Sequence, residues 1–596
     1  MEAKPPNVII VLTDDQGYGD MSCHGNEYIN TPNIDRLHGE SARFTDFHVD
    51  PTCSPTRAAL MTGRYASRTG VWLTYMGRNH LRADEVTMGD VFRSAGYRTA
   101  VFGKWHLGDN YPFRPQDRGF DESLIHSGGV VGETPDIWGN DYYDDTYLRN
   151  GQPEEVDGYC TDVWFREAMQ FIRSNSDQPF FVYLATNAPH GPFHVPEKYV
   201  KPHLGRKGIP EHRARFYGML AAVDENVGKM RDGLDKLGLA DDTVIVYLTD
   251  NGTTAGVGLK AARGGRQTDG FPVSGFNAGM RGKKGSAYEG GHRVACFVHW
   301  RNGGISKGTD IPQLSAHFDL LPTLIDLCGL PLPNVDFDGT SLKPLLKGSF
   351  SWNDRTLLVH HQGRFGQKIT DDRPVKYKAY SVMTDRWRLV GDELYDRQAD
   401  PGQRKDIAAE HPEVATRLKE DYEKWWADIS TRFDEYCRTI VGSDKQAKTV
   451  LTSQAWHGDD CPYNQQHVRS AMQANGFWDV TVAQSGTYEI ALRRWPEELN
   501  ISFDATVQLG PLDPAKLDTH WRLFELPSRP ILAKTARLKV EDFDESRPIP
   551  EDSKSVTFRV HLKGGDADIQ TWLTTADGNS WGAYYVTVKR IEPPEI

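Results

Sequence analysis

Continuous runs of apolar residues recur through the first half of the chain. The clearest runs lie at 7–13, 99–102, 179–185 and 242–249. Because their apolar residues follow one another without alternation, each run is typical of a strand buried on both faces of a parallel sheet. A helix is expected from Pro32, because proline suits the first helical position. The pattern predicts an α/β fold, with a mainly parallel sheet sandwiched by helices.

The pattern changes beyond about residue 350 to shorter strands, such as 387–390. From about residue 450, apolar and polar residues alternate, as in 478–482, which is the period-2 pattern of half-buried strands. The sequence D-G-N at 577–579 fits a hairpin turn. We therefore predict three domains: an α/β domain at 1–350, a small subdomain at 351–435 and an appended all-β sandwich at 450–596.

Charge and hydropathy limit what the chain binds. It has 69 basic and 82 acidic residues among 596, a net charge of −13. This balance argues against general binding to nucleic acid or to an anionic membrane, so an anionic substrate would need a local basic pocket. No apolar run approaches the length of about 20 residues that spans a membrane.

The N-terminus and the cysteines say little about the compartment. Residues 1–6 lack the apolar region of a signal peptide, so the protein is either cytosolic or already in its mature form. The seven cysteines include no C-x-x-C pair, which argues against a zinc cluster or a disulfide scaffold. Six cysteines remain when Cys53 is set aside, and this even number permits bridges without indicating any.

Oxygen-bearing side chains follow two of the predicted strands. Asp14 and Asp15 follow the first, and Asp250 and Asn251 follow the fourth. Ligands of open α/β sheets bind beyond the carboxyl ends of the strands. Four oxygen donors without histidine or thiolate suit Ca²⁺ or Mg²⁺ better than zinc or copper. In isolation, a solvated turn explains Asp14 and Asp15 equally well.

The segment C-S-P-T-R at 53–57 is predicted to start a helix that ends near Gly63. Cys53 would then lie at a helix N-terminus, which favours a bound anion and lowers the pKa of a thiol. Arg57 lies one helical turn further and adds a charge shaped for oxyanions. A lone cysteine in such a place is more often a small buried residue than a nucleophile.

Other polar residues follow the remaining strands. Lys104 and His106 come just past the strand at 99–102, and His190 follows the strand at 179–185. On its own, His190 would more often be a structural histidine that is hydrogen-bonded in the core or lies on the surface. Its place beyond a strand end instead favours a site.

The pattern C-x-P-x-R at 53–57, with T-G-R at 62–64, closely resembles the signature of the type I sulfatases of the alkaline-phosphatase-like superfamily. The segments G-K-W-H-L-G at 103–108 and K-G-x-x-x-E-G-G-x-R from Lys284 resemble further sulfatase signatures. The resemblance covers about residues 7–430. It implies a catalytic α/β domain and, at 351–435, an antiparallel sheet with one helix near 412–426.

The resemblance implies that Cys53 is oxidised to formylglycine, whose hydrated aldehyde is the nucleophile. It implies metal ligation, by Ca²⁺ or alternatively Mg²⁺, at Asp14, Asp15, Cys53, Asp250 and Asn251. It implies catalytic residues at Cys53, Arg57, Lys104, His106, His190 and Lys284.

Each catalytic residue has an expected role from the same resemblance. Arg57 would stabilise the hydrate, and Lys104 and Lys284 would bind the sulfate oxygens. His190 would protonate the departing alcohol, and His106 would help to remove the proton that releases sulfate and restores the aldehyde.

The expected substrate is a sulfated oligo- or polysaccharide, as for a bacterial carbohydrate sulfatase. The extra β-domain favours it over a small aryl sulfate, as do Trp105, His360, His361 and the basic loop around Arg263 and Arg266. Each of these features is equally compatible with packing or surface roles. The expected partner is a formylglycine-generating maturation enzyme, and the expected location is periplasmic or secreted.

Two alternatives stay open at this point. A phosphonate or phosphate ester hydrolase of the same superfamily would use the same metal, arginine and lysines. A non-catalytic glycan-binding protein would use the β-sandwich for affinity, and it would need none of the catalytic set.

Overall fold

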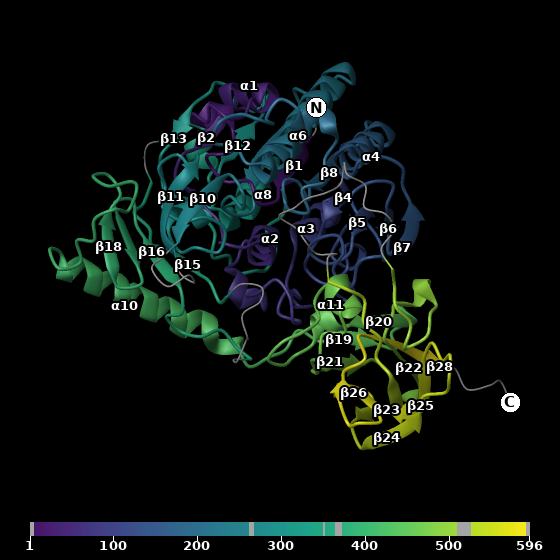
Figure 1. The fold of residues 1–596 in the computed structure, drawn as a ribbon. Helices are drawn as coiled ribbons and strands as arrows, with labels where there is room; N and C mark the ends of the chain where they lie inside the picture. Colours follow the sequence, from purple (N-terminus) through teal and green to yellow (C-terminus); the bar gives the residue numbers. More distant parts are fainter. Residues whose placement is uncertain (1–4, 262–267, 350–351, 364–371, 509–525, 592–596) are drawn as a thin grey trace.

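The computed structural model describes residues 5–261, 268–349, 352–363, 372–508 and 526–591. A ten-stranded sheet forms its centre (Figure 1). The strands lie in the order β13 (Asp310–Ile311), β2 (Ala42–Phe44), β12 (Cys296–His299), β9 (Thr243–Thr249), β1 (Asn7–Thr13), β8 (Phe180–Ala185), β4 (Arg98–Lys104), β5 (Glu122–His126), β6 (Thr146–Arg149) and β7 (Gln152–Glu155). The five middle strands, β9 to β5, are parallel, which confirms the predicted mainly parallel sheet.

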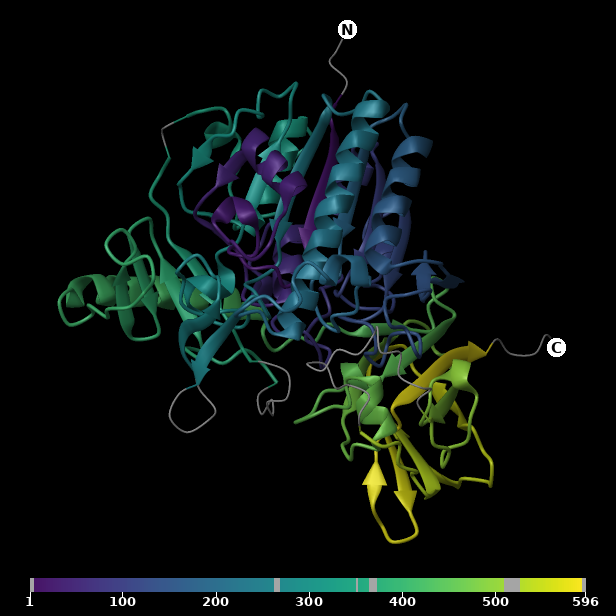
Figure 2. The same cartoon turned by 45° about the horizontal axis from the view of Figure 1, so that its top comes forward.

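Both faces of this sheet are buried, as the apolar runs predict. Ile9 and Val11 of β1 pack under α1 (Pro32–Glu40), α4 (Cys160–Ser174) and α6 (Glu211–Lys236). Val8 and Ile10 point to the other face, which α2 (Cys53–Thr62), α3 (Met88–Ser94) and α8 (Leu320–Cys328) cover. Figure 2 shows the long helices lying along the strands. Successive β1 side chains thus point to opposite faces of the sheet and pack against the helices on each side.

The small subdomain is the predicted antiparallel sheet with one helix. Its strands are β15 (Leu357–His360), β16 (Tyr380–Met383), β17 (Trp387–Val390) and β18 (Glu393–Asp396), and α10 (Pro412–Ile429) covers them. Arg388 of β17 is fully buried and bonds to Asp46 at 2.9 Å and to Glu289 at 2.7 Å. This buried ion pair network connects the subdomain to the α/β domain.

The C-terminal part is a β-sandwich, as the alternating pattern predicts. One sheet contains β19 (Thr439–Val441), β21 (Phe477–Val482), β26 (Gly565–Thr575), β23 (Ala533–Val540) and β24 (Phe543–Pro548), with β27 (Ser580–Trp581) paired to β26. The other contains β20 (Lys448–Thr452), β28 (Tyr585–Ile591), β22 (Gly486–Arg493) and β25 (Val556–Leu562). Residues 577–579 form the turn between β26 and β27. Strand β19 lies N-terminal to the predicted start at 450.

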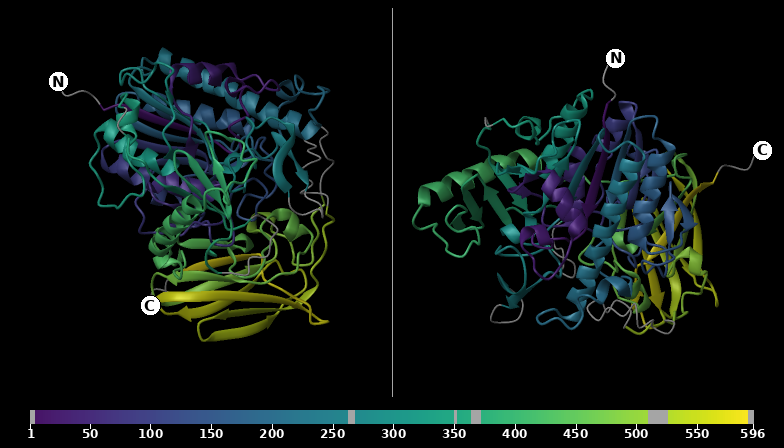
Figure 3. Two further views of the ribbon diagram at one scale, coloured as in Figure 1. Left: turned by 90° about the vertical axis from the view of Figure 1, so that its left-hand side faces the viewer. Right: turned by 90° about the horizontal axis from the view of Figure 1, so that it is seen from above.

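The sandwich packs beside the end of the central sheet at which the parallel strands finish (Figures 2 and 3). The remaining short elements are β3 (Phe47–His48), β10 (Val257–Ala261), β11 (Thr268–Gly275), β14 (Ser315–Ala316), α5 (Glu197–Val200), α7 (Glu289–His292), α9 (Lys343–Leu346) and α11 (Gln465–Arg469). All seven cysteines are described, and none is in a disulfide. Within the described ranges, no helix has the length and apolar character needed to cross a bilayer.

Candidate active site

Four oxygen-bearing side chains meet where β1 and β9 end. These strands are neighbours, with Thr13 paired to Thr249, so the residues that follow them lie side by side. The Asp15 amide donates to Asp250 Oδ1 at 3.0 Å, and Asn251 Nδ2 donates to Asp15 Oδ1 at 2.8 Å. Asp14, Asp15, Asp250 and Asn251 are all fully buried. The sheet topology therefore assembles the predicted donor set.

Helix α2 brings Cys53 to this cluster. Cys53 Sγ, one carboxylate oxygen of Asp14 and one of Asp250 all lie within 4.8 Å of one another. Arg57, one turn along α2, donates to Asp250 Oδ2 and to the Lys104 carbonyl, each at 2.9 Å. Burial raises the pKa of the Cys53 thiol and outweighs the nearby lysines. The expectation that the helix N-terminus lowers this pKa is therefore wrong, because the thiol is fully desolvated.

Two lysines neutralise the carboxylates. Lys104 is the last residue of β4, rather than past its end, and its Nζ lies 2.6 Å from Asp14 Oδ2. Lys284 Nζ lies 2.6 Å from Asp15 Oδ1, whereas the neighbouring Lys283 donates to the Thr254 carbonyl at 3.0 Å. Burial alone would lower the pKa of both active-site lysines, but the carboxylates reverse this and raise it. Both ammonium groups therefore stay charged.

The donor set fits a hard divalent cation. Asp14 Oδ1 and Asn251 Oδ1 are buried and have no hydrogen-bond partner among the described residues. Burial first and the charge of Asp14 second raise the pKa of Asp250 to about 7. A bound cation would favour the ionised form of this carboxyl. Oxygen ligands of this kind are those that Ca²⁺ and Mg²⁺ prefer.

His106 is buried and held in a fixed orientation. Its Nε2 lies 2.9 Å from the Thr74 carbonyl, which can only accept, so the ring proton is on Nε2. Nδ1 has no hydrogen-bond partner in the described chain. A Cβ on Gly129 would lie 2.3 Å from the ring, so only glycine allows this approach. Burial and the charge of Lys104 lower the pKa of His106 well below its usual range, which leaves Nδ1 as an unprotonated base.

His190 lies beyond β8, as predicted. Its Nδ1 donates to the Gly191 carbonyl at 2.7 Å, and its Nε2 faces Asp15 Oδ2 at 3.5 Å. Burial lowers the pKa of His190 to about 3, even though Asp15 acts in the opposite direction. In this state the ring is neutral, and Nε2 is an acceptor.

A cavity of about 230 Å³ reaches the cluster. Three predicted residues line it: Asp15, His190 and Lys284. The other lining residues were missed from the sequence: Val130, Val131, Gly132, Glu133, Thr254, Tyr463 and Asn464. Thr254 could have been found, because it follows Asn251 closely and its hydroxyl donates to Asp15. No sequence signal points to Tyr463 or Asn464, which belong to the β-sandwich.

The expected sugar-contacting residues lie elsewhere. Trp105 is buried in the core and donates to the Phe113 carbonyl, and His360 packs among Trp425 and Trp426 of α10. The rings of Trp105 and His360 are therefore not available to a substrate, because both are packed against other side chains. His361 is also buried. Arg263 and Arg266 lie outside the described residues.

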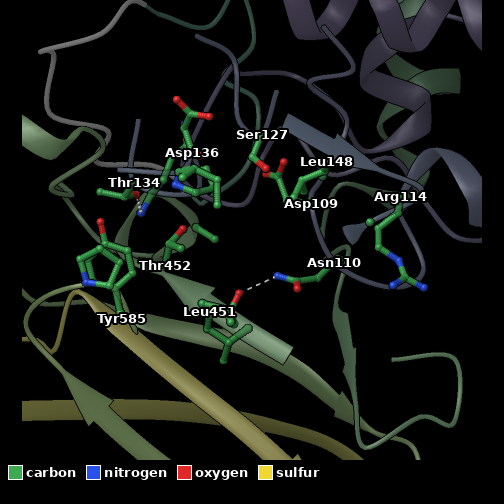
Figure 4. Close-up of a pocket in the computed structure, with 18 of the residues that line it drawn as sticks. Asp109, Asn110, Arg114, Ser127, Thr134, Asp136, Leu148, Leu451, Thr452 and Tyr585 are labelled. Atoms are coloured by element: carbon green, nitrogen blue, oxygen red, sulfur yellow. Dashed lines mark hydrogen bonds between the residues drawn. The ribbon is translucent and has the colours of Figure 1, made fainter. Parts of the chain in front are cut away.

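A second cavity, of about 580 Å³, lies between the α/β domain and the sandwich (Figure 4). Asp109, Asn110 and Arg114 line it from one domain, and Thr452 and Tyr585 from the other. Asn110 Nδ2 also crosses the interface to the Val450 carbonyl at 2.9 Å. The residues that line this cavity include none of the predicted metal or catalytic residues, so it is separate from the carboxylate cluster.

Comparison with known families covers most of the chain. Residues 6–330 match the Sulfatase family model, and residues 282–427 match the model described as N-sulphoglucosamine sulphohydrolase, C-terminal. Both matches end before the β-sandwich begins.

Individual relatives agree with these matches. Human arylsulfatase A is 32% identical over 469 residues, which are 70% of this chain and 87% of that protein. Human N-acetylgalactosamine-6-sulfatase is 31% identical over 370 residues, 58% of this chain and 66% of that protein. A solved structure of Ps i-CgsB in complex with k-i-k-neocarrahexaose is 28% identical, with a TM-score of 0.60, over 73% of this chain and 100% of that one.

Proposed function

The chain belongs to the sulfatase family and is a sulfuric ester hydrolase; on this premise we propose that it desulfates a sulfated oligo- or polysaccharide. The proposed nucleophile is a formylglycine formed from Cys53, and the proposed cofactor is Ca²⁺ or Mg²⁺. The observation that carries the proposal is the buried cluster in which Cys53 Sγ lies within 4.8 Å of carboxylate oxygens of Asp14 and Asp250.

The cation would be held by Asp14, Asp15, Asp250, Asn251 and residue 53. When bound, it supplies positive charge that orients a hydroxyl of residue 53 and lowers that hydroxyl's pKa. Asp14 Oδ1 and Asn251 Oδ1 support this assignment, because both are buried acceptors that receive no hydrogen bond from the residues the structure describes. Arg57 holds Asp250 in place through its 2.9 Å bond.

Lys104 and Lys284 are the proposed sulfate-binding residues. Each ammonium lies 2.6 Å from a carboxylate of the cluster, and the charge of each acts to lower the pKa of the Cys53 thiol. In sulfate transfer, negative charge develops on the sulfate oxygens, and preorganised cations in a desolvated site stabilise it. Because ion pairs already fix both ammonium groups, little energy is needed to reorganise them during the reaction.

The two histidines are proposed to move protons at different atoms. His190 Nε2 faces the cavity beside Asp15, where it would deliver a proton to the departing alcohol. Because Nδ1 is committed to the Gly191 carbonyl, this requires the imidazolium form, which the negative charge of a bound sulfate ester favours. His106 Nδ1 is free to accept the proton of a hydroxyl of residue 53, because Nε2 is bonded to Thr74.

A sulfated carbohydrate is supported by what the relatives are called. One is an N-acetylgalactosamine-6-sulfatase, and one solved structure holds k-i-k-neocarrahexaose. For such a polymer we propose a periplasmic or secreted location. Conversion of Cys53 would require a formylglycine-generating enzyme as a maturation partner.

The test is release of inorganic sulfate from sulfated mono-, oligo- and polysaccharides by protein coexpressed with that maturation enzyme. We expect release from one glycan class and none from a Cys53→Ala variant. Phosphate and phosphonate esters serve as parallel substrates. Turnover of these esters alone, or turnover that persists in Cys53→Ala, would contradict the proposal.

A further inference from the structure

Part of the catalytic cavity is built by a different domain from the one that holds the carboxylates. Resting on the proposed function, we infer that the β-sandwich segment 453–464 restricts this cavity to one sugar unit. The enzyme then acts on a single or chain-terminal sulfated sugar, whose ring packs against Tyr463. The sandwich is thus part of the active site rather than a spacer.

The cavity wall is a fixed structure shared by two domains. Glu133 and Asn464 pair as an antiparallel β-bridge. The Thr134 amide donates to the Tyr463 carbonyl at 3.0 Å, and the Gln465 amide donates to the Gly132 carbonyl at 2.8 Å. Backbone hydrogen bonds on both sides of the bridge hold Tyr463 at the cavity, and its ring also contacts the rings of Tyr75 and His467.

The same segment also holds the surroundings of His106. The Gln454 amide side chain donates to Glu133 Oε2, which accepts the Gly129 amide at 2.6 Å, and Gly129 touches the His106 ring. The Gln454 carbonyl accepts the Met76 amide at 2.6 Å, two residues from the carbonyl that binds His106. A domain that served only as a spacer would not need contacts to both loops around a catalytic histidine.

The chemistry of the wall suits a sugar ring. Val130, Val131 and Tyr463 are largely apolar residues of this wall, whereas Glu133 and Asn464 add polar groups. A sugar has apolar C–H faces and a polar rim, and a tyrosine ring provides flat apolar area at low entropic cost. The cavity volume of about 230 Å³ lies below the roughly 300–1,000 Å³ of pockets for larger ligands. One sugar with its sulfate fits this size better than a run of sugars.

The experiment compares two oligosaccharides of equal length from the class that the sulfate-release panel identifies. One carries its single sulfate on the terminal unit and the other on an internal unit. We expect kcat/KM to favour the terminal sulfate by at least about 100-fold. Tyr463→Ala should lower kcat/KM for the terminal substrate about tenfold, the effect of about 1.4 kcal/mol of lost packing, and should narrow the preference.

Three further variants keep the test decisive. Tyr463→Phe retains the ring and should retain the preference. Tyr463→Leu keeps apolar volume without the flat ring, and it replaces Tyr463→Ala if that protein melts early. Leu532→Ala removes a side chain of the same domain that is 59% exposed and lies outside the cavity, and it should change neither rate.

Equal rates on terminal and internal sulfates would overturn the inference while leaving the proposed function intact. Unchanged kinetics in both Tyr463→Ala and Tyr463→Leu would also overturn it. If converted protein releases sulfate from no carbohydrate, the proposed function fails, and the inference fails with it.

Discussion

The two sides of the proposed catalytic cavity are built in different ways. One side consists of strand-end and loop residues of the α/β domain, Asp15, His190 and Lys284, and both basic side chains face Asp15. The other side joins a loop of that domain to Tyr463 of the sandwich through backbone hydrogen bonds. In the proposed function, the first side carries the chemistry and the second limits the space around it. On this proposal, a change in the domain contact would alter the substrate range and leave the chemistry the same.

Removal of the divalent cation should have the largest effect, because it acts on the side that carries the chemistry. We expect chelation to reduce sulfate release to background and added Ca²⁺ or Mg²⁺ to restore it. Because the ion would bind only the folded protein, added Ca²⁺ should also raise the melting temperature. Full activity in protein shown by elemental analysis to hold no metal would contradict the proposed cofactor.

Lys284→Ala should be the next largest loss. Removal of one preorganised group that stabilises developing charge costs about 10²–10³-fold in kcat. Lys283→Ala is the matched control, because Lys283 bonds to the Thr254 carbonyl and not to a carboxylate of the cluster. Steady-state kinetics of the two variants measures the difference, and equal losses would remove Lys284 from the sulfate-binding role.

Glu133→Gln should change the pH dependence of stability on the sandwich side. Burial raises the pKa of Glu133 from 4.5 to about 7. The folded protein therefore binds this proton more tightly than the unfolded chain does. The stability that this tighter proton binding by Glu133 contributes is present below pH 4.5 and is lost as the pH rises through 7.

The expected size of this change is about 3 kcal/mol, from about 1.4 kcal/mol per pKa unit. Urea unfolding of both proteins between pH 4 and 8 measures it. We expect the free energy of unfolding of the wild type to fall relative to that of Glu133→Gln over this range. Parallel curves would show that Glu133 titrates normally.

Gln465→Ala should have the smallest effect of the four. Its side chain donates to the carbonyls of Glu133, Asp136 and Ile137 at 3.2–3.3 Å and accepts the Gly139 amide at 3.2 Å. Loss of these buried hydrogen bonds should cost about 1–3 kcal/mol of unfolding free energy. An unchanged melting temperature would contradict a stabilising role for these hydrogen bonds between the two domains.

The catalytic side was predictable because its signals are local. The run at 7–13 became β1 with the predicted bounds, and strand ends in a parallel sheet must share an edge. The basic loop that was expected around Arg263 and Arg266 lies between β10 and β11, which pair as antiparallel strands that the sequence analysis did not predict. The pKa of the Cys53 thiol was also mispredicted, because burial depends on the whole fold.

The sandwich side was not predictable in the same way. The alternation in 478–482 predicts the strand β21 correctly, but the strand is more than half-buried, because the polar Asp479 is buried as well. The alternating pattern does not indicate which surface of the sandwich contacts another domain. Tyr463 lies between strands, and its place in the cavity arises from pairing with residues far earlier in the chain.

The most direct test of the account is the mass of the tryptic peptide Phe44–Arg57 from protein that releases sulfate. The account predicts that residue 53 carries the formylglycine aldehyde, in a fraction that rises in proportion to specific activity. Fully active protein in which this peptide contains only unmodified cysteine would contradict it.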